Sequence, residues 1–307
     1  MEPIIEIKNL TKDYETGFWR KKKVRALDDL TLSVEGGQIF GFLGGNGAGK
    51  TTTIKILMSL LFATSGSAKI LGHDISEVNM HQSIGYCPEN PYFYDYLTAF
   101  ELMNYFGEIF GVNGPRRKEK AAELLTKVGL EEKDWNKQLR KFSKGMLQRV
   151  GLAQSLINDP TVVFLDEPMS GLDPMGRREI RELIAGLRAN GTTVFMSTHI
   201  LSDVAILRGG KLAATGRLDD LLTRHEEQRP FEVVVSGVSA EHLRIEMENV
   251  GADSITSNAN GSIVRVPDEK HIERILQITR DSGGKLVSVS AVKQSLEELF
   301  VKESADD

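Results

Sequence analysis

A glycine-rich segment between a short apolar run and a predicted helix constrains the fold of this chain more than any other feature. The apolar run covers residues 39–43, the predicted helix covers residues 52–62, and the segment between them fits the pattern G-x-x-x-x-G-K-[ST]. It consists of Gly44, Gly45, Asn46, Gly47, Ala48, Gly49, Lys50 and Thr51, and Thr52 follows at the start of the helix. Glycines in such a loop turn successive backbone N–H groups toward a phosphate at the helix N-terminus. The sequence therefore predicts an α/β nucleotide-binding core.

Two side chains give this loop its chemistry. Lys50 would contact the β- and γ-phosphates of a nucleoside triphosphate, and the Thr51 hydroxyl would bind Mg²⁺. A glycine-rich turn without function is the alternative, but the strand before the loop and the helix after it favour the phosphate-binding interpretation. The motif alone does not distinguish an ATPase from a GTPase or a kinase.

A second apolar run ends in two carboxylates. Residues 162–165 are apolar, and Asp166 and Glu167 follow directly. Acidic residues at strand ends are often solvated caps, but in a chain that also has the glycine-rich loop this pattern predicts a catalytic pair. Asp166 would help to bind Mg²⁺, and Glu167 would polarise the attacking water.

Further short motifs, in a fixed order, make the chain resemble the ATP-binding cassette (ABC) ATPases over residues 4–222. The matching motifs are residues 86–89 (Q-loop), 142–146 (signature motif) and 170–173 (D-loop), with Tyr14 as the aromatic residue that stacks on adenine and His199 as the switch histidine. The ordered set is far more specific than any one of its members.

The resemblance implies a head-to-tail dimer with two ATP molecules at its interface. Ser143 and the backbone N–H of Gly145 in one subunit would contact the γ-phosphate held by Lys50 of the other, since a helix N-terminus with a hydroxyl suits an anion. His199 would contact the γ-phosphate and orient the water. The implied cofactors are ATP and Mg²⁺. The implied ATP contacts are Tyr14, the loop residues Gly44 to Thr52, Glu89, Ser143, Lys144, Gly145, Met146 and Asp173, and the implied Mg²⁺ ligands are Thr51, Glu89 and Asp166.

The sequence departs from the pattern of this family at four places. Gly45 stands where proline or serine is usual, which makes the loop more flexible. Glu89 replaces the Q-loop glutamine; it can still bind Mg²⁺ through oxygen, but it adds a negative charge beside the γ-phosphate. Lys144 and Met146 replace a glycine and a glutamine of the signature motif, as in the drug- and antibiotic-export branch. After the switch histidine, only residues 200–204 precede the next strand, where the family has a helix.

The pattern of apolar residues predicts two domains. Residues 1–222 would form the ABC ATPase domain, a P-loop NTPase core with an N-terminal antiparallel β subdomain and a mostly helical insertion at 91–159. Residues 223–230 have the composition of a polar linker. Residues 231–302 have the order βαββαβ, which predicts a small ferredoxin-like α+β domain, and a tail follows at 303–307.

The composition excludes several classes of protein. The net charge of -5 gives no overall attraction to nucleic acid, and the single cysteine, Cys87, rules out an internal disulfide and fits a reducing compartment. An apolar run of about 18 residues, which a membrane span would need, is absent from the sequence. The first residues lack the pattern of a signal peptide. We therefore expect a protein at the cytoplasmic face of the cell membrane, which it reaches through a separate permease.

These observations predict the ATP-hydrolysing subunit of an ABC exporter, which works as a dimer of two copies of this chain on a transmembrane permease. A soluble ABC ATPase that acts on nucleic acid or ribosomes is the alternative. Such proteins usually have two cassettes, long coiled coils or zinc modules, whereas this chain has one cassette, no long heptad run and no net positive charge. Glu167 argues against a regulatory switch that binds a nucleotide without turnover.

Two further segments bear on how the protein meets a membrane. An aromatic run follows the Q-loop, in the region that receives a cytoplasmic helix of the membrane subunit in this family. The run contains Tyr92, Phe93, Tyr94 and Tyr96. We expect one or two of them to be exposed as anchors for the permease. The basic segment at residues 20–25 is better interpreted as a solvated turn than as a contact with anionic lipid headgroups.

Overall fold

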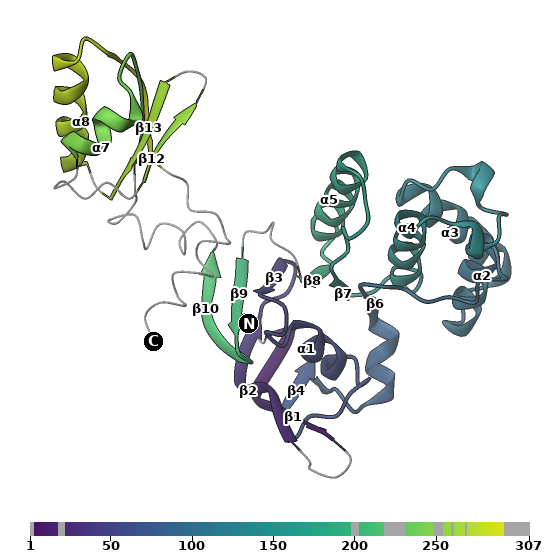
Figure 1. Cartoon of the computed structure of the whole chain (residues 1–307). Helices are drawn as coiled ribbons and strands as arrows, with labels where there is room; N and C mark the ends of the chain where they lie inside the picture. The colour runs from purple at the N-terminus through teal and green to yellow at the C-terminus, as the bar shows by residue number, and fades with distance from the viewer. Residues whose placement is uncertain are drawn as a thin grey trace. The chain divides into compact units, whose positions relative to one another are not determined.

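The computed structural model describes residues 3–17, 22–197, 203–217, 231–247, 254–258, 261–267 and 269–291. The chain divides into two compact units, Met1–Leu218 and Asp219–Asp307 (Figure 1). The predictions that fall outside the described residues concern Arg20 and Lys21 of the basic segment, His199 with residues 200–202 after it, the end of the ATPase domain and the linker at 218–230, and the end of the second domain and the tail at 292–307.

Four strands in the first part of the chain form an antiparallel sheet in the order β2-β1-β4-β5. They are β1 (Ile5–Thr16), β2 (Lys22–Val34), β4 (Ser65–Ile70) and β5 (His73–Asp74). Polar and apolar residues alternate in β2, so that Leu30, Leu32 and Val34 are buried, as the sequence predicts. This sheet is the predicted N-terminal antiparallel subdomain.

A second sheet has six strands in the order β10-β9-β3-β8-β7-β6, and its neighbouring strands are parallel except for β10 and β9. The strands are β3 (Ile39–Gly44), β6 (Ile84–Cys87), β7 (Val162–Asp166), β8 (Thr193–Ser197), β9 (Asp203–Arg208) and β10 (Lys211–Arg217). Every residue of β7 and β8 is buried, as expected for central parallel strands that are covered on both faces. The C-terminal ends of β3, β6 and β7 meet at one edge of the sheet, where ligands bind in sheets of this kind.

Helices cover both faces of the six-stranded sheet. Helix α1 (Lys50–Leu57) shares an apolar core with both sheets, and α5 (Pro174–Ala189) packs on the other face in a second core. The predicted extension of α1 to residue 62 is wrong. The helix ends at Leu57 because Ser59 has a left-handed φ of 54°, and Leu60 and Phe62 beyond it are exposed.

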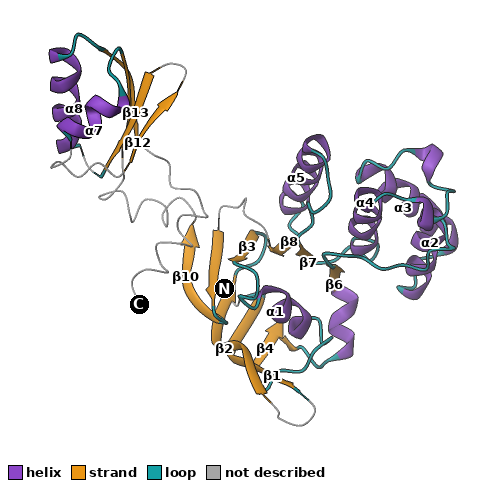
Figure 2. Ribbon diagram, in the orientation of Figure 1, coloured by secondary structure: helices purple, strands orange, loops and turns teal. Residues whose placement is uncertain are grey.

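The predicted helical insertion gathers on the β6 side of the sheet (Figure 2). It contains α2 (Ala99–Ile109), α3 (Gly114–Lys127) and α4 (Lys144–Ser155), with 3₁₀ turns η2 (Glu132–Asp134) and η3 (Leu139–Lys141), while turn η1 (Val78–Ser83) precedes β6. The capping box of α2 is confirmed, since Thr98 Oγ1 accepts from the Glu101 N–H at 3.2 Å and Glu101 Oε2 accepts from the Thr98 N–H at 2.8 Å. The insertion shares one apolar core with β6, β7 and α5.

In the part of the second unit that the structure describes, the elements follow the βαββαβ order that the sequence predicts. Its elements are β11 (Phe231–Ser236), α7 (Ala240–Glu246), β12 (Ser254–Asn258), β13 (Gly261–Val266), α8 (Lys270–Asp281) and β14 (Lys285–Ala291). The strands form an antiparallel sheet in the order β12-β13-β11-β14, and both helices pack with it in one core. This is a ferredoxin-like arrangement.

Candidate nucleotide-binding site

The loop between β3 and α1 borders a cleft of about 390 Å³. The cleft is lined by Ala26, Gly45, Asn46, Gly47, Ala48, Gly49, Lys50, Thr51, Thr52, Glu89, Asp166, Glu167 and Ser170. The glycine-rich loop therefore meets Glu89, which follows β6, and the pair Asp166 and Glu167 at the end of β7. Sequence reasoning missed Ala26 and assigned Ser170 to the D-loop without placing it in the cleft.

Three glycines of the loop, Gly44, Gly47 and Gly49, have backbone conformations that other residues rarely adopt, and Gly44 has a φ of 157°. Gly47 has a φ of 81° and Gly49 a φ of 108°. At Gly49, a Cβ atom would lie 2.6 Å from Leu27 Cδ2 and 2.7 Å from the Ala26 carbonyl oxygen. At Gly45, φ is not left-handed and a Cβ would meet nothing within 4 Å, so a side chain fits where the family usually has one.

The Lys50 ammonium group lies against the loop that precedes it. Its Nζ donates to the carbonyl oxygen of Gly44 at 2.6 Å and to that of Gly45 at 3.2 Å. Lys50 and Thr51 are the first residues of α1, where the helix dipole favours an anion. Loop, ammonium and helix N-terminus thus present positive charge to the same cleft.

The carboxylate pair at the end of β7 is held by a serine from the neighbouring strand. Asp166 is buried, and its Oδ1 accepts a hydrogen bond from Ser197 Oγ at 2.7 Å. The same Oγ accepts from the Glu167 backbone N–H at 2.8 Å. Glu167 has a left-handed φ of 48°. Sequence reasoning considered the segment that contains Ser197 only for its histidine, so this contact was missed.

Cys87, the last residue of the strand that leads to Glu89, is buried and faces α4. Burial, with the nearby Asp166 charge, raises the pKa of Cys87 to about 12, and the same causes raise the pKa of Tyr86 to about 12. Gln148 Nε2 lies 3.8 Å from Cys87 Sγ, and among the described residues Gln148 Oε1 has no hydrogen-bond partner. The Q-loop is thus connected directly to the helix of the signature motif.

The signature motif forms the N-terminus of α4. Ser143 caps the helix, since its Oγ accepts from the Met146 N–H at 3.2 Å. Lys144 Nζ lies 3.3 Å from Oγ of Ser170, and a Cβ at Gly145 would lie 3.1 Å from the Gly171 carbonyl oxygen. The start of α4 therefore packs on the D-loop of its own chain.

Of the D-loop residues, Ser170 lines the cleft, but Asp173 and the signature residues do not. Asp173 caps α5, and its Oδ1 accepts from the Gly176 N–H at 2.9 Å. Among the described residues, the lining of the cleft includes neither Asp173 nor the predicted signature contacts Ser143, Lys144, Gly145 and Met146. Within one chain, the structure does not bring these residues to the cleft.

Tyr14 also lies outside the lining of the cleft but is connected to it. Its hydroxyl is 3.4 Å from Thr52 Oγ1, and Lys12 Nζ lies 5.3 Å from the centre of its ring. The position of Tyr14 on β1, beside the helix that carries the phosphate-binding loop, is compatible with contact to a nucleotide base.

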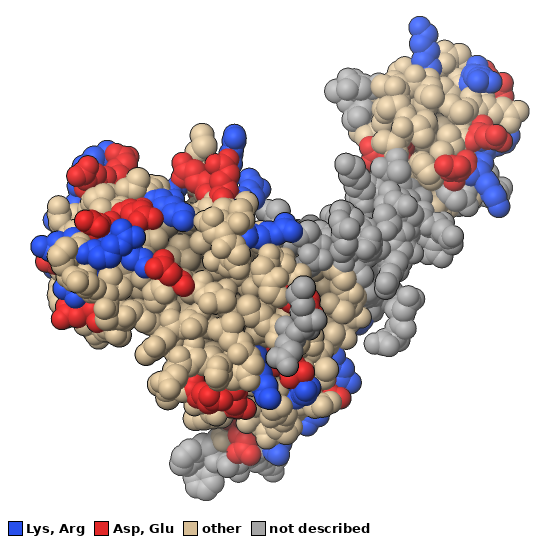
Figure 3. Space-filling model, turned by 180° about the vertical axis from the view of Figure 1, so that it is seen from behind, with Lys and Arg blue, Asp and Glu red and all other residues tan. Residues whose placement is uncertain are grey.

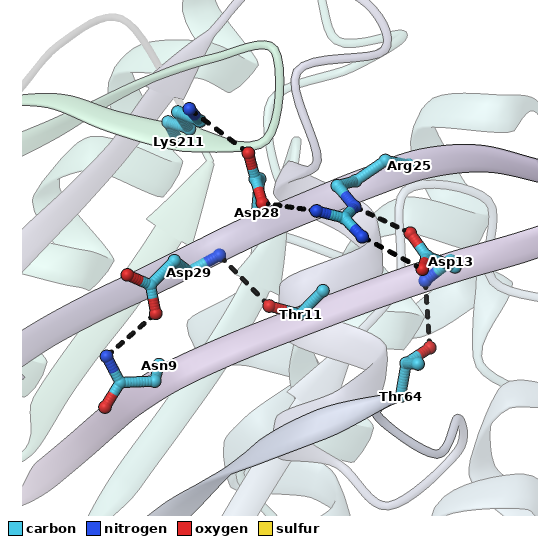
Figure 4. Close-up of polar contacts among 8 residues, drawn as sticks. All are labelled: Asn9, Thr11, Asp13, Arg25, Asp28, Asp29, Thr64 and Lys211. Carbon is cyan, nitrogen blue, oxygen red and sulfur yellow. Dashed lines mark hydrogen bonds and ion pairs between the residues drawn. The ribbon is translucent and has the colours of Figure 1, made fainter.

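A chain of ion pairs runs along the strands beside the cleft (Figure 4). Lys211 Nζ lies 3.2 Å from Asp28 Oδ2, Arg25 Nη1 donates to Asp28 Oδ1 at 2.8 Å, and Arg25 Nε donates to Asp13 Oδ1 at 2.8 Å. The hydrogen bond from Arg25 is the main cause that lowers the pKa of Asp13, and that from Lys211 is the main cause that lowers the pKa of Asp28. These pairs connect β1, β2 and β10 around Ala26, which lines the cleft.

The residues predicted to bind Mg²⁺ fit that ion together with a nucleotide. Thr51, Glu89 and Asp166 all line the cleft and supply oxygen donors. Among the described residues, no group of three or more His, Cys, Asp or Glu side chains could hold a metal by itself. Mg²⁺ commonly takes one or two carboxylates with phosphate oxygens and water, so this donor set suits Mg²⁺ bound with phosphate.

Comparison with known proteins agrees with this geometry. A sequence profile of the family described as ABC transporter matches residues 27–170. An uncharacterised ABC transporter ATP-binding protein of Synechocystis sp. is 40% identical over 98% of this chain and 84% of the relative. This chain belongs to the ABC transporter ATP-binding proteins. The bacitracin transport ATP-binding protein BcrA of Bacillus licheniformis is 33% identical over 98% of this ABC protein and 97% of the relative.

Solved structures of ABC ATPase cassettes share the fold of most of this chain. The dimeric post-hydrolysis structure of the ATP-binding cassette MJ0796, bound to ADP and Pi, has a TM-score of 0.65 and 26% identity. The match covers 70% of this ABC ATPase and 98% of the chain in that structure. In the part of the chain that the structure describes, no helix has the length and apolar character to cross a membrane.

Proposed function

We propose that this ABC ATPase is the motor of an exporter, in which two copies of the chain hydrolyse ATP and drive a separate transmembrane permease. One observation carries the proposal. The phosphate-binding loop and the carboxylate pair share one cleft, while the signature motif at the N-terminus of α4 does not line it. A second subunit is the simplest source of the missing contacts, and the dimeric cassette with ADP and Pi supports this assembly.

Within one subunit, the residues of the cleft have different roles in hydrolysis. Lys50 and the loop N–H groups bind the β- and γ-phosphates. Glu167 accepts a hydrogen bond from the attacking water, whose oxygen forms a bond to the γ-phosphorus while its proton passes to the Glu167 carboxylate and from there to a phosphate oxygen. The bond from that phosphorus to the oxygen it shares with the β-phosphate breaks, and ADP and phosphate are released. Mg²⁺, held by Thr51, Asp166 and Glu89, would neutralise charge on the phosphate oxygens.

The second subunit would bring the N-terminus of its α4 to the γ-phosphate. The Ser143 hydroxyl and the N–H of Gly145 are suited to an anion because they lie at the positive end of a 12-residue helix. Met146, whose N–H is already bonded to Ser143 Oγ, keeps that cap in place. His199 of the switch motif would complete the site.

An exposed aromatic surface supports docking to a permease. Tyr92 is 96% exposed, Tyr94 55% and Tyr96 60%, which is one more exposed residue than the sequence predicts. Phe93 instead packs against the apolar core of the helical insertion. Tyr92 borders an apolar groove of about 340 Å³ that Phe106 also lines. Exposed aromatic side chains beside an apolar groove favour a protein partner.

Membrane contact through that permease would keep the subunit at the cytoplasmic face. Export is inferred from the resemblance of the signature motif to the drug- and antibiotic-export branch, and the bacitracin transport relative supports a role in transport. The distribution of charge favours this role over binding to nucleic acid. On the face seen in Figure 3, Lys and Arg side chains are interspersed with Asp and Glu, and much of the surface carries no charge. A nucleic-acid backbone would require a continuous basic surface.

The proposal is tested by two ATPase measurements. Turnover per subunit should rise with protein concentration over the range in which light scattering reports a shift from monomer to dimer. Glu167→Gln should abolish turnover but retain ATP, and should give a stable ATP-bound dimer. Glu182→Gln, an exposed position on α5, is the matched control and should keep wild-type turnover. Constant turnover per subunit from monomer to dimer, or an active Glu167→Gln variant, would contradict the proposal.

A further inference from the structure

One serine hydroxyl joins the two carboxylate residues of the cleft. Ser197 is the last residue of β8 and is fully buried. Its Oγ donates to Asp166 Oδ1 at 2.7 Å and accepts from the Glu167 N–H at 2.8 Å. A hydroxyl has a single proton but two lone pairs, so it can make both bonds only in one orientation. Because Ser197 does not line the cleft, any influence on a ligand must pass through these two neighbours.

The Ser197 hydroxyl holds Glu167 in a backbone conformation that residues other than glycine rarely adopt. Glu167 has a left-handed φ of 48°, which is uncommon for a residue with a side chain. Its N–H is bonded to Ser197, and its carbonyl oxygen accepts from the Ser170 N–H at 2.9 Å. The backbone of Glu167 is therefore held on both sides, and this determines where its side chain begins. An unusual backbone conformation persists only where its surroundings maintain it.

The strand register supplies this contact. Asp166 and Ser197 are direct partners in the parallel pairing of β7 with β8. Since both strands end at this edge of the sheet, a shift of one residue would turn the hydroxyl to the opposite face. Both strands are buried along their whole length, so the register and the hydroxyl position are fixed by packing.

We propose that Ser197 is a positioning residue for ATP hydrolysis. Its hydroxyl orients the Asp166 carboxylate and holds the Glu167 backbone, so that both side chains meet the nucleotide in the geometry that turnover requires. The inference rests on the roles proposed above for Asp166 and Glu167. It predicts that loss of the hydroxyl lowers kcat, while ATP binding, which depends on the loop and Lys50, is preserved.

The same strand offers a matched control for the loss of a buried hydroxyl. Thr193, the first residue of β8, is also fully buried, and its Oγ1 accepts from the Gly37 N–H at 2.8 Å. It lies four positions before Ser197, roughly 13 Å along the strand. Thr193→Val therefore removes the hydrogen bond of a buried hydroxyl at the opposite end of β8, away from the cleft.

The experiment compares Ser197→Ala, Ser197→Cys and Thr193→Val with the wild-type chain. It measures kcat and KM for ATP, the affinity for a fluorescent ATP analogue, and the midpoint of thermal unfolding. Ser197→Ala should lower kcat by about 10- to 100-fold, as a small misplacement of catalytic groups does, and should change the analogue affinity by less than about twofold. Thr193→Val should keep kcat within about twofold of wild type, even if its midpoint of thermal unfolding falls as far as that of Ser197→Ala.

Ser197→Cys keeps the shape of the side chain but has a weak hydrogen-bonding group, so it should also lower kcat. If the alanine variant fails to fold, the cysteine variant still tests the inference. Wild-type kcat in a folded Ser197→Ala or Ser197→Cys variant would overturn the inference. So would an equal loss of kcat in Thr193→Val. Glu167→Gln distinguishes a failure of this inference from a failure of the proposed function. If that variant is inactive while Ser197→Ala is fully active, only the role of Ser197 is wrong.

Discussion

Alanine substitutions at three glycines of the phosphate-binding loop should have graded effects on stability. The positions differ in backbone conformation and in free space. At Gly45, φ is not left-handed and a Cβ meets nothing within 4 Å. At Gly47 the space is also free, but φ is 81°. At Gly49, φ is 108° and a Cβ would lie 2.6 Å from Leu27 Cδ2 and 2.7 Å from the Ala26 carbonyl oxygen.

The magnitudes follow from these differences. A left-handed conformation costs a residue with a side chain about 1–2 kcal/mol, and overpacking costs about 1–3 kcal/mol more. Gly45→Ala should leave the free energy of unfolding unchanged or raise it by up to about 1 kcal/mol, because alanine restricts the unfolded chain. Gly47→Ala should lower it by about 1–2 kcal/mol. Gly49→Ala should lower it by about 2–5 kcal/mol, the sum of both effects.

Urea denaturation followed by tryptophan fluorescence measures this series. Both tryptophans of the chain, Trp19 and Trp135, belong to the first unit, so the signal reports on the unit that contains the loop. Equal unfolding midpoints for Gly45→Ala and Gly49→Ala would refute the reasoning. A Gly47→Ala variant less stable than Gly49→Ala would show that the contacts of a Cβ at position 49 with Leu27 and Ala26 do not lower the free energy of unfolding.

Three other predictions concern nucleotide binding, the buried cysteine and the docking surface. Lys50→Ala should weaken ATP binding at least tenfold, about 1.4 kcal/mol, in isothermal titration; unchanged affinity would exclude contact between Lys50 and the phosphates. Cys87, whose pKa burial raises to about 12, should resist an aromatic disulfide reagent at pH 8 until urea unfolds the protein, and rapid labelling of the native chain would contradict its burial. Tyr92→Ser and Tyr96→Ser should reduce co-purification with the permease at an unchanged unfolding midpoint, whereas Phe93→Ser should lower that midpoint; full co-purification would place the docking surface elsewhere.

The glycine-rich loop and the carboxylate pair could be predicted from the sequence because each depends on local order along the chain. A strand, a loop with glycines at set positions and a helix place Lys50 and Thr51 at a helix N-terminus whatever surrounds them. Parallel strands also bring the residues that follow them to one edge of a sheet. The place of Asp166 at the end of an apolar run therefore followed from the sequence, whereas Glu89 was assigned to the site only by its resemblance to the Q-loop. The structure shows that Glu89 follows β6, whose C-terminal end lies at the same edge of the sheet as that of β7.

Other features depended on tertiary packing. The end of α1 at Leu57 reflects a left-handed Ser59, which the apolar pattern of residues 52–62 did not indicate. The aromatic run after the Q-loop contains three exposed rings and one, Phe93, that is half-buried. Only the packing of the helical insertion decided that Phe93 turns inward while Tyr92 and its neighbours remain exposed.

The sequence by itself thus determined the chemistry of the phosphate-binding loop and of the acidic pair, because short-range order specifies both. The contact of Ser197 with that pair was decided by the tertiary structure alone. It requires β7 and β8 to be neighbours in one particular register, with Asp166 opposite Ser197. That register is set by the burial of both faces of the sheet, where the rings of Phe164 and Phe195 pack with their centres 5.4 Å apart. Packing of this kind joins residues 31 positions apart and leaves no pattern in the local sequence.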